Sequence, residues 1–71
     1  MTELETLIQN GIVNLENGNF EDALSFFEQA LLLNQDDPDL WNQKGVVLRS
    51  LGRYDEALEC YNKSLQLDPR D

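Results

Sequence analysis

Few side chains of this 71-residue chain could perform chemistry, and their spacing forms no reaction centre. The sequence contains no histidine, so the commonest general base is missing. Cys60 is the single cysteine, so it can form no internal disulfide and has no histidine to activate it as a nucleophile. It lies within a segment of helical periodicity, which favours a small packing residue. The four glycines are scattered and form no phosphate-binding loop. We therefore expect no enzyme and no cofactor.

One acidic cluster resembles a set of metal ligands. Asp36, Asp37 and Asp39 follow one another closely, but they lack the alternating oxygen ligands and the closing glutamate of a calcium-binding loop. Helix capping explains Asp37, because a proline suited to the first helical position follows it directly. We therefore expect no bound metal.

The charge of the chain is strongly acidic and unevenly distributed. The net charge is −9, of which residues 1–37 contribute −8 and residues 38–71 contribute −1. Nucleic acids and anionic membranes need clustered lysine and arginine, so we expect neither as a partner. Two interpretations remain: a preference for basic ligands or for head-to-tail contact between unlike halves, and a solvated surface that aids solubility. Without an apolar stretch of about 18 residues or a signal pattern, a cytoplasmic protein is expected.

The chain repeats itself with a step of 34 residues. Nine residues recur unchanged after one step, among them Gly11, Gly18, Ala23, Leu24, Leu31 and Leu33, which return as Gly45, Gly52, Ala57, Leu58, Leu65 and Leu67. A period of 20 to 50 residues is typical of stacked units, each of which buries a face against the next. Such proteins usually offer a binding surface rather than a reaction centre.

Local signals divide each repeat into two helices. Thr2 and Glu5 have the spacing of a capping box, which begins a helix. The glycines at 18 and 52 favour the conformation that ends helices, and Asp37-Pro38 favours the start of another. Apolar residues recur at helical spacing, and the fourth helix copies the buried stripe of the second with Ala57, Leu58, Tyr61, Ser64 and Leu65. The prediction is an all-α fold of two helix-turn-helix hairpins.

These residues resemble the tetratricopeptide repeat family, whose motif runs W-x2-L-G-x2-Y, then A-x3-F, then P. The second repeat has Trp41, Gly45, Ala57 and Pro69 at the motif positions, with Tyr61 in place of the phenylalanine. It has Lys44 in place of the leucine and Leu48 in place of the tyrosine. The resemblance implies a single domain over 1–71, with repeats at 4–37 and 38–71. It also implies four antiparallel helices stacked as a short right-handed α-solenoid. The small residues of the motif would lie where paired helices cross, and Trp41 would fill space between the repeats.

In this family, the first helix of each hairpin lines a concave groove that receives a peptide or a helix of another protein. The resemblance places this groove at Glu5, Ile8, Ile12, Leu15, Asn42, Val46 and Arg49. An apolar ridge with a polar rim is typical of an interaction site, and it suits an apolar or basic segment of a partner. These side chains can equally serve as packing within or between the repeats, because so short a chain has little other core.

The two ends of the predicted stack differ. Asn10, Asn14 and Asn17 form a polar stripe on the first helix, as expected of a cap that faces water. Spacing places Cys60, Ser64 and Leu67 on the opposite end, which is less polar. Two repeats without a further cap suggest a unit of a longer array, or a chain that self-associates as a homo-oligomer through that end. An interaction module is the preferred function, and a self-assembling structural unit is the alternative.

Overall fold

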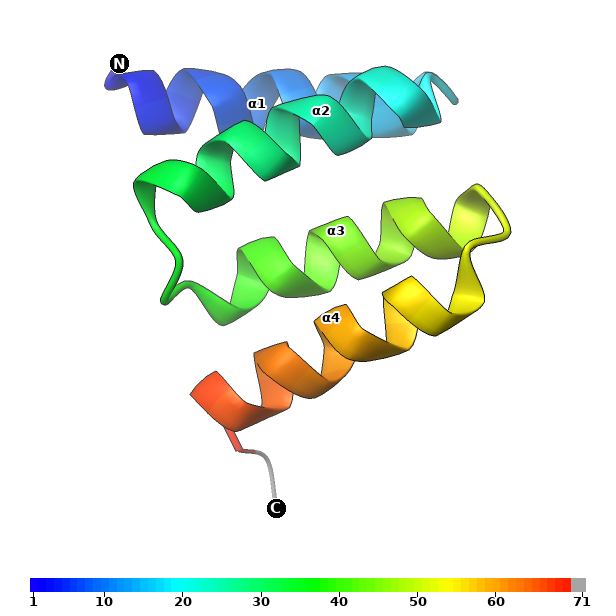
Figure 1. Cartoon of the computed structure of the whole chain (residues 1–71). Helices are drawn as coiled ribbons and strands as arrows, with labels where there is room; N and C mark the ends of the chain where they lie inside the picture. The colour runs from blue at the N-terminus through cyan, green and yellow to red at the C-terminus, as the bar shows by residue number, and fades with distance from the viewer. Residues whose placement is uncertain (70–71) are drawn as a thin grey trace.

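The computed structural model describes residues 1–69, which form four helices and, within that range, no strand. The helices are α1 (Glu3–Glu16), α2 (Phe20–Leu33), α3 (Pro38–Ser50) and α4 (Tyr54–Leu67). Each helix packs against the next, so they follow one another through a stack of two hairpins (Figure 1). The predicted all-α fold of two helix-turn-helix hairpins is confirmed.

The helix ends are fixed by the local chemistry that the sequence predicts. The backbone N–H of Glu5 donates to the Thr2 hydroxyl at 3.1 Å, and the Glu5 side chain accepts from the backbone of Thr2, which completes the capping box. Asp37 accepts from the backbone N–H of Asp39 at 2.9 Å and caps α3. The turns within the two hairpins contain glycines with φ of 78° and 79°, at Gly18 and Gly52. Residues other than glycine rarely adopt this backbone conformation, so both turns depend on their glycine.

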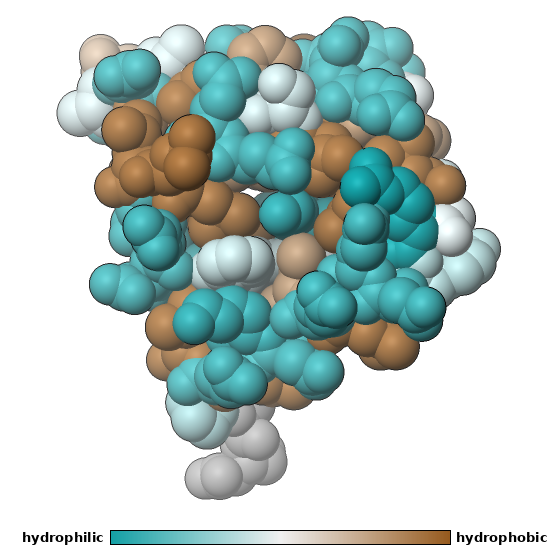
Figure 2. All heavy atoms as spheres, viewed as in Figure 1, coloured by the Kyte–Doolittle hydropathy of each residue, from teal (hydrophilic) through white to brown (hydrophobic). Residues whose placement is uncertain are grey.

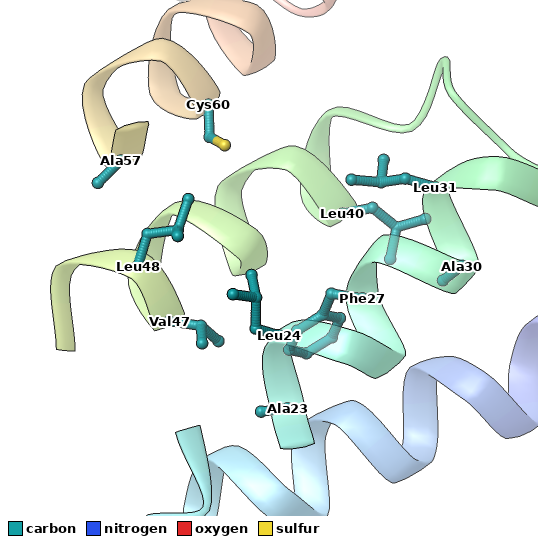
Figure 3. Packing of buried hydrophobic residues seen from close by; sticks show 10 residues of the cluster. All are labelled: Ala23, Leu24, Phe27, Ala30, Leu31, Leu40, Val47, Leu48, Ala57 and Cys60. Carbon is teal, nitrogen blue, oxygen red and sulfur yellow. The ribbon is translucent and has the colours of Figure 1, made fainter. Parts of the chain in front are cut away.

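The core runs through the stack between α2, α3 and α4. Figure 3 shows ten of its side chains converging on this region. Among its largest fully buried side chains are Phe27 of α2 and Leu40, Val47 and Leu48 of α3. Because α2 and α3 belong to different hairpins, this core joins the two repeats into one unit.

Glycine allows the paired helices to approach closely at one point in each hairpin. A Cβ atom added to Gly11 would lie 2.7 Å from the Phe27 ring, and one added to Gly45 would lie 2.7 Å from the Tyr61 ring. Real Cβ atoms essentially never lie this close to another nonbonded atom, so each aromatic ring occupies the space that a side chain would take. The expectation that these glycines lie at helix crossings is confirmed.

Trp41 lies at the joint between the hairpins. Its indole N–H donates to the backbone carbonyl of Gln35 in the linker at 2.8 Å. The Lys44 ammonium lies 5.6 Å from the centre of the indole ring and 3.5 Å from a carboxylate oxygen of Glu28 on α2. The half-buried tryptophan thus fills space between the repeats, as predicted, and polar contacts hold it in place.

One part of the predicted buried stripe is wrong. Leu58 and Leu65 of α4 are 58% and 50% exposed, whereas their counterparts one repeat earlier, Leu24 and Leu31, are 5% and 6% exposed. Figure 3 shows the earlier pair directed toward α3. Within residues 1–69, no helix lies against the same side of α4. The repeated leucines therefore have the same identity but different surroundings.

Candidate functional site

The residues predicted to bind a partner lie on equivalent sides of α1 and α3. We call them the groove face, which comprises Glu5, Ile8, Ile12, Leu15, Asn42, Val46 and Arg49. The step of 34 residues relates Ile8 to Asn42, and it likewise relates Ile12 to Val46. Each pair therefore occupies the same position on the first helix of its hairpin. The α1 part of the face is mostly apolar, and the α3 part is mostly polar.

The apolar side chains of the groove face have two roles at once. Ile8, Ile12 and Leu15 pack against the core, yet each remains half-buried rather than fully buried. Val46 is also half-buried. Side chains that are fixed on one side and open on the other present an apolar surface with little freedom left to lose on binding. Packing and partner contact, which the sequence leaves as alternatives, are compatible at these positions.

The polar members of the groove face differ in their availability. Asn42 and Arg49 are exposed on α3. The Glu5 carboxylate is also exposed, but it accepts hydrogen bonds from the Thr2 hydroxyl at 3.0 Å and the Thr2 backbone N–H at 3.4 Å. Its first role is therefore to cap α1. Of the two ends of the groove face, the α3 end has the freer hydrogen-bonding groups.

A hollow that the sequence does not predict lies between α2 and α4, with α3 beneath it. It encloses about 370 Å³, and Figure 2 shows a recess at the middle of this side of the molecule. Its lining comes from three helices and comprises Glu28, Trp41, Lys44, Leu48, Arg53, Glu56, Glu59, Cys60 and Lys63. Acidic and basic groups are balanced there, so the hollow favours neither sign of ligand.

Within that hollow, one ion pair accounts for two shifted pKa values. The Arg53 guanidinium donates to the Glu56 carboxylate one turn along α4. This hydrogen bond lowers the pKa of Glu56 and raises the pKa of Arg53. Both groups are exposed, so water screens the pair and it contributes little to stability.

The predicted self-association residues do not share an open face. Cys60 and Ser64 are buried inside the second hairpin, and only Leu67 is partly accessible. The Ser64 hydroxyl donates to the backbone carbonyl of Pro38 at 2.9 Å, which joins α4 to the start of α3. Burial raises the pKa of the Cys60 thiol. Cys60 and Ser64 therefore pack within their own hairpin. The sequence pattern predicts that this side of α4 is open to another chain, but α3 covers it.

No group of three or more acidic, histidine or cysteine side chains in residues 1–69 could hold a metal ion, the aspartates around position 37 included. None of the described helices combines the length and apolar character needed to cross a membrane.

Comparison with protein families gives a consistent result over most of the chain. Models of the tetratricopeptide repeat match residues 38–71 and residues 14–40. The two matches overlap at residues 38–40, which lie at the start of α3. Both hairpins thus carry sequence features of the same repeat.

Curated relatives agree with this result. An uncharacterized protein of Methanocaldococcus jannaschii is 38% identical over 64 residues, which span 90% of this chain and 74% of that protein. A tetratricopeptide repeat-containing protein of the same organism is 39% identical over 56 residues, 79% of this chain and 18% of its own length. The peroxisomal targeting signal receptor of Candida albicans is 37% identical over 59 residues, 83% of this chain but only 10% of the receptor. Together with the repeat matches and the two stacked hairpins, these similarities show that the chain belongs to the tetratricopeptide repeat family.

Proposed function

We propose that this chain is a protein-interaction module that binds an extended peptide or a helix of a partner along its groove face. Family membership supports a general role in protein–protein interaction. The observation that carries the finer proposal is the half-buried ridge of Ile8, Ile12 and Leu15, which the core holds in place. Burying apolar surface provides most of the affinity in such contacts.

The groove face also determines which chemistry the partner needs. An apolar side chain of the ligand would pack on the α1 ridge, and the exposed amide of Asn42 can hydrogen-bond to a ligand backbone. The first repeat carries no basic residue, so its field attracts basic groups and repels acidic ones. An apolar segment with flanking lysine or arginine satisfies both conditions.

A charge placed on the ridge tests this assignment. Peptides selected from a random display library would be labelled, and their affinity measured by fluorescence anisotropy. Ile12→Asp should weaken binding of ridge-directed peptides at least about tenfold, because a carboxylate would be desolvated in the contact. Thermal unfolding of the same variant shows whether the fold persists.

The matched control lies one residue further along α1. Val13 is an exposed β-branched residue outside the groove face, and Val13→Asp adds the same charge to the same helix. It should leave the affinity within about twofold, since surface changes away from a contact usually have small effects. Equal losses in the two variants, or intact binding in Ile12→Asp, would contradict the groove assignment.

A further inference from the structure

An exposed apolar face occupies the end of the stack at α4. We call it the rear face, and it comprises Tyr54, Leu58 and Leu65, all exposed. The internal repeat allows the exposure of these residues to be compared with that of their counterparts one step earlier. The counterparts on α2, namely Phe20, Leu24 and Leu31, are half-buried or buried. In the first repeat, a helix covers these positions. The rear face therefore has the composition of a helix-covered surface, but no described helix covers it.

The opposite end of the stack has the reverse character. We call it the front face, and it comprises Thr6, Asn10, Val13 and Asn17 of α1, all exposed. One step later, the same positions of α3 contain Leu40, Lys44, Val47 and Leu51, which are buried or half-buried. Figure 3 shows Leu40 and Val47 directed toward α2. The front face thus has a threonine and an asparagine where α3 has leucines.

This comparison disfavours stacking of one copy behind another. In that arrangement the front face would take the place of α3 against a rear face, and it would bury the Thr6 hydroxyl and the Asn17 amide at positions where α3 has Leu40 and Leu51. A buried polar group without a partner costs about 1–3 kcal/mol, so these two groups would offset much of the apolar gain.

The distribution of charge leads to the same conclusion. The first repeat carries −8 and the second −1. Front-to-rear stacking would bring the −8 repeat of one copy against the next copy, and front-to-front contact would join two −8 repeats. Contact between two rear faces joins the nearly neutral repeats and keeps the −8 repeats apart.

We propose that the rear face binds the rear face of a second copy of this chain, so that α4 packs against α4 about a twofold axis. Such an interface is self-complementary and closed, so assembly ends at two chains. With antiparallel helices, Leu58 of one copy meets Leu65 of the other. The axis passes near Asn62, whose amide has both donors and an acceptor and can hydrogen-bond to the Asn62 amide of the second copy. The proposal is independent of the groove face, which lies on α1 and α3.

Sedimentation velocity over a range of protein concentrations tests the proposal. The expected result is a reversible change from monomer to dimer, without larger species, and with more dimer at high salt because two −9 chains repel each other. Leu58→Asp should raise the dissociation constant at least about tenfold. Leu32→Asp is the matched control, since Leu32 is 79% exposed on α2 outside the rear face, and it should leave the dissociation constant unchanged. Circular dichroism checks that both variants remain folded.

A cross-linking measurement locates the axis. Asn62→Cys should give a covalent dimer with a short bis-maleimide reagent, whereas Gln29→Cys, on the exposed part of α2, should not. The native Cys60 is buried, so the reagent should not react with it in the unsubstituted protein. A monomer at all concentrations would overturn the proposal and leave the rear face to a helix of another protein. Growth beyond two chains, weakening by salt, or a dimer insensitive to Leu58→Asp would overturn it as well.

Discussion

At the scale of single residues, the hairpins depend on positions where a side chain is missing. Gly11 and Gly45 leave room for an aromatic ring from the paired helix, and each ring fills it. The two sites differ in one respect: the Phe27 ring is fully buried, whereas the Tyr61 ring is only half-buried. A fully enclosed ring has less freedom to move away, so the first hairpin should tolerate a new methyl group less well than the second.

Alanine substitution tests this difference directly. Gly11→Ala should lower the free energy of unfolding by about 1–2 kcal/mol, because an overpacking cost of about 1–3 kcal/mol exceeds the gain in helix propensity. Gly45→Ala should cost less. Urea titration followed by circular dichroism measures both. In the double variant Gly11→Ala/Phe27→Leu, part of the loss should be recovered, and the absence of coupling between the two substitutions would show that the ring is not the obstacle.

At the scale of helices, identical residues acquire different roles from their neighbours. Leu24 and Leu58 are equivalent members of the repeat, but within residues 1–69 only Leu24 has a helix of another hairpin against it. The hydrophobic stripe of α4 therefore faces two environments. The part around Ala57 and Cys60 belongs to the hairpin, and the part around Leu58 forms the rear face.

Truncation of the two leucines should give unequal effects. Leu24→Ala should lower the free energy of unfolding by about 2–5 kcal/mol, enough to unfold much of a domain this small. Leu58→Ala should change it by less than about 0.5 kcal/mol, measured by urea titration at low protein concentration. Similar losses in both variants would mean that α4 is covered as fully as α2.

The same contrast explains what the sequence could and could not predict. Helix starts and ends were predictable because Thr2, Gly18 and Asp37 act through atoms only a few residues away. The groove residues follow from the repeat step and the family resemblance. The exposure of Leu58 was not predictable, because it depends on whether another helix lies alongside. Ser64 is buried, as the predicted stripe of the fourth helix has it. Its second assignment, to a self-association face, missed the hydrogen bond to the Pro38 carbonyl, which is 26 residues away in the sequence.

At the scale of the whole molecule, charge opposes the compact state. The chain carries −9, and the last turn of α1 contains an acidic residue, Glu16, but no basic one. An acidic group near the carboxyl end of a helix interacts unfavourably with the helix dipole. The ion pairs of Lys44 with Glu28 and of Arg53 with Glu56 are surface contacts. Only one of these four groups, Glu28, belongs to the first repeat, so most of the repulsion among the carboxylates of that repeat remains.

Salt should therefore stabilise the monomer. Raising NaCl from 10 to 500 mM should increase the Tm by roughly 3–6 °C, because screening weakens the repulsion among the carboxylates. Differential scanning calorimetry at low protein concentration measures this increase. The variant Glu16→Gln/Asp36→Asn carries two fewer charges and should show a smaller rise. A Tm that falls with salt would show that attractive ion pairs dominate instead.

The position of Trp41 makes the joint between the repeats visible to spectroscopy. It is the single tryptophan of the chain, and its indole contacts Gln35 of the linker and Lys44, which in turn pairs with Glu28 of α2. Its fluorescence emission therefore arises from one place, where the second hairpin meets the first. Separation of the hairpins would hydrate the indole and shift its emission to longer wavelength, even with all four helices intact. The protein thus carries an intrinsic optical reporter that distinguishes loss of stacking from loss of helix.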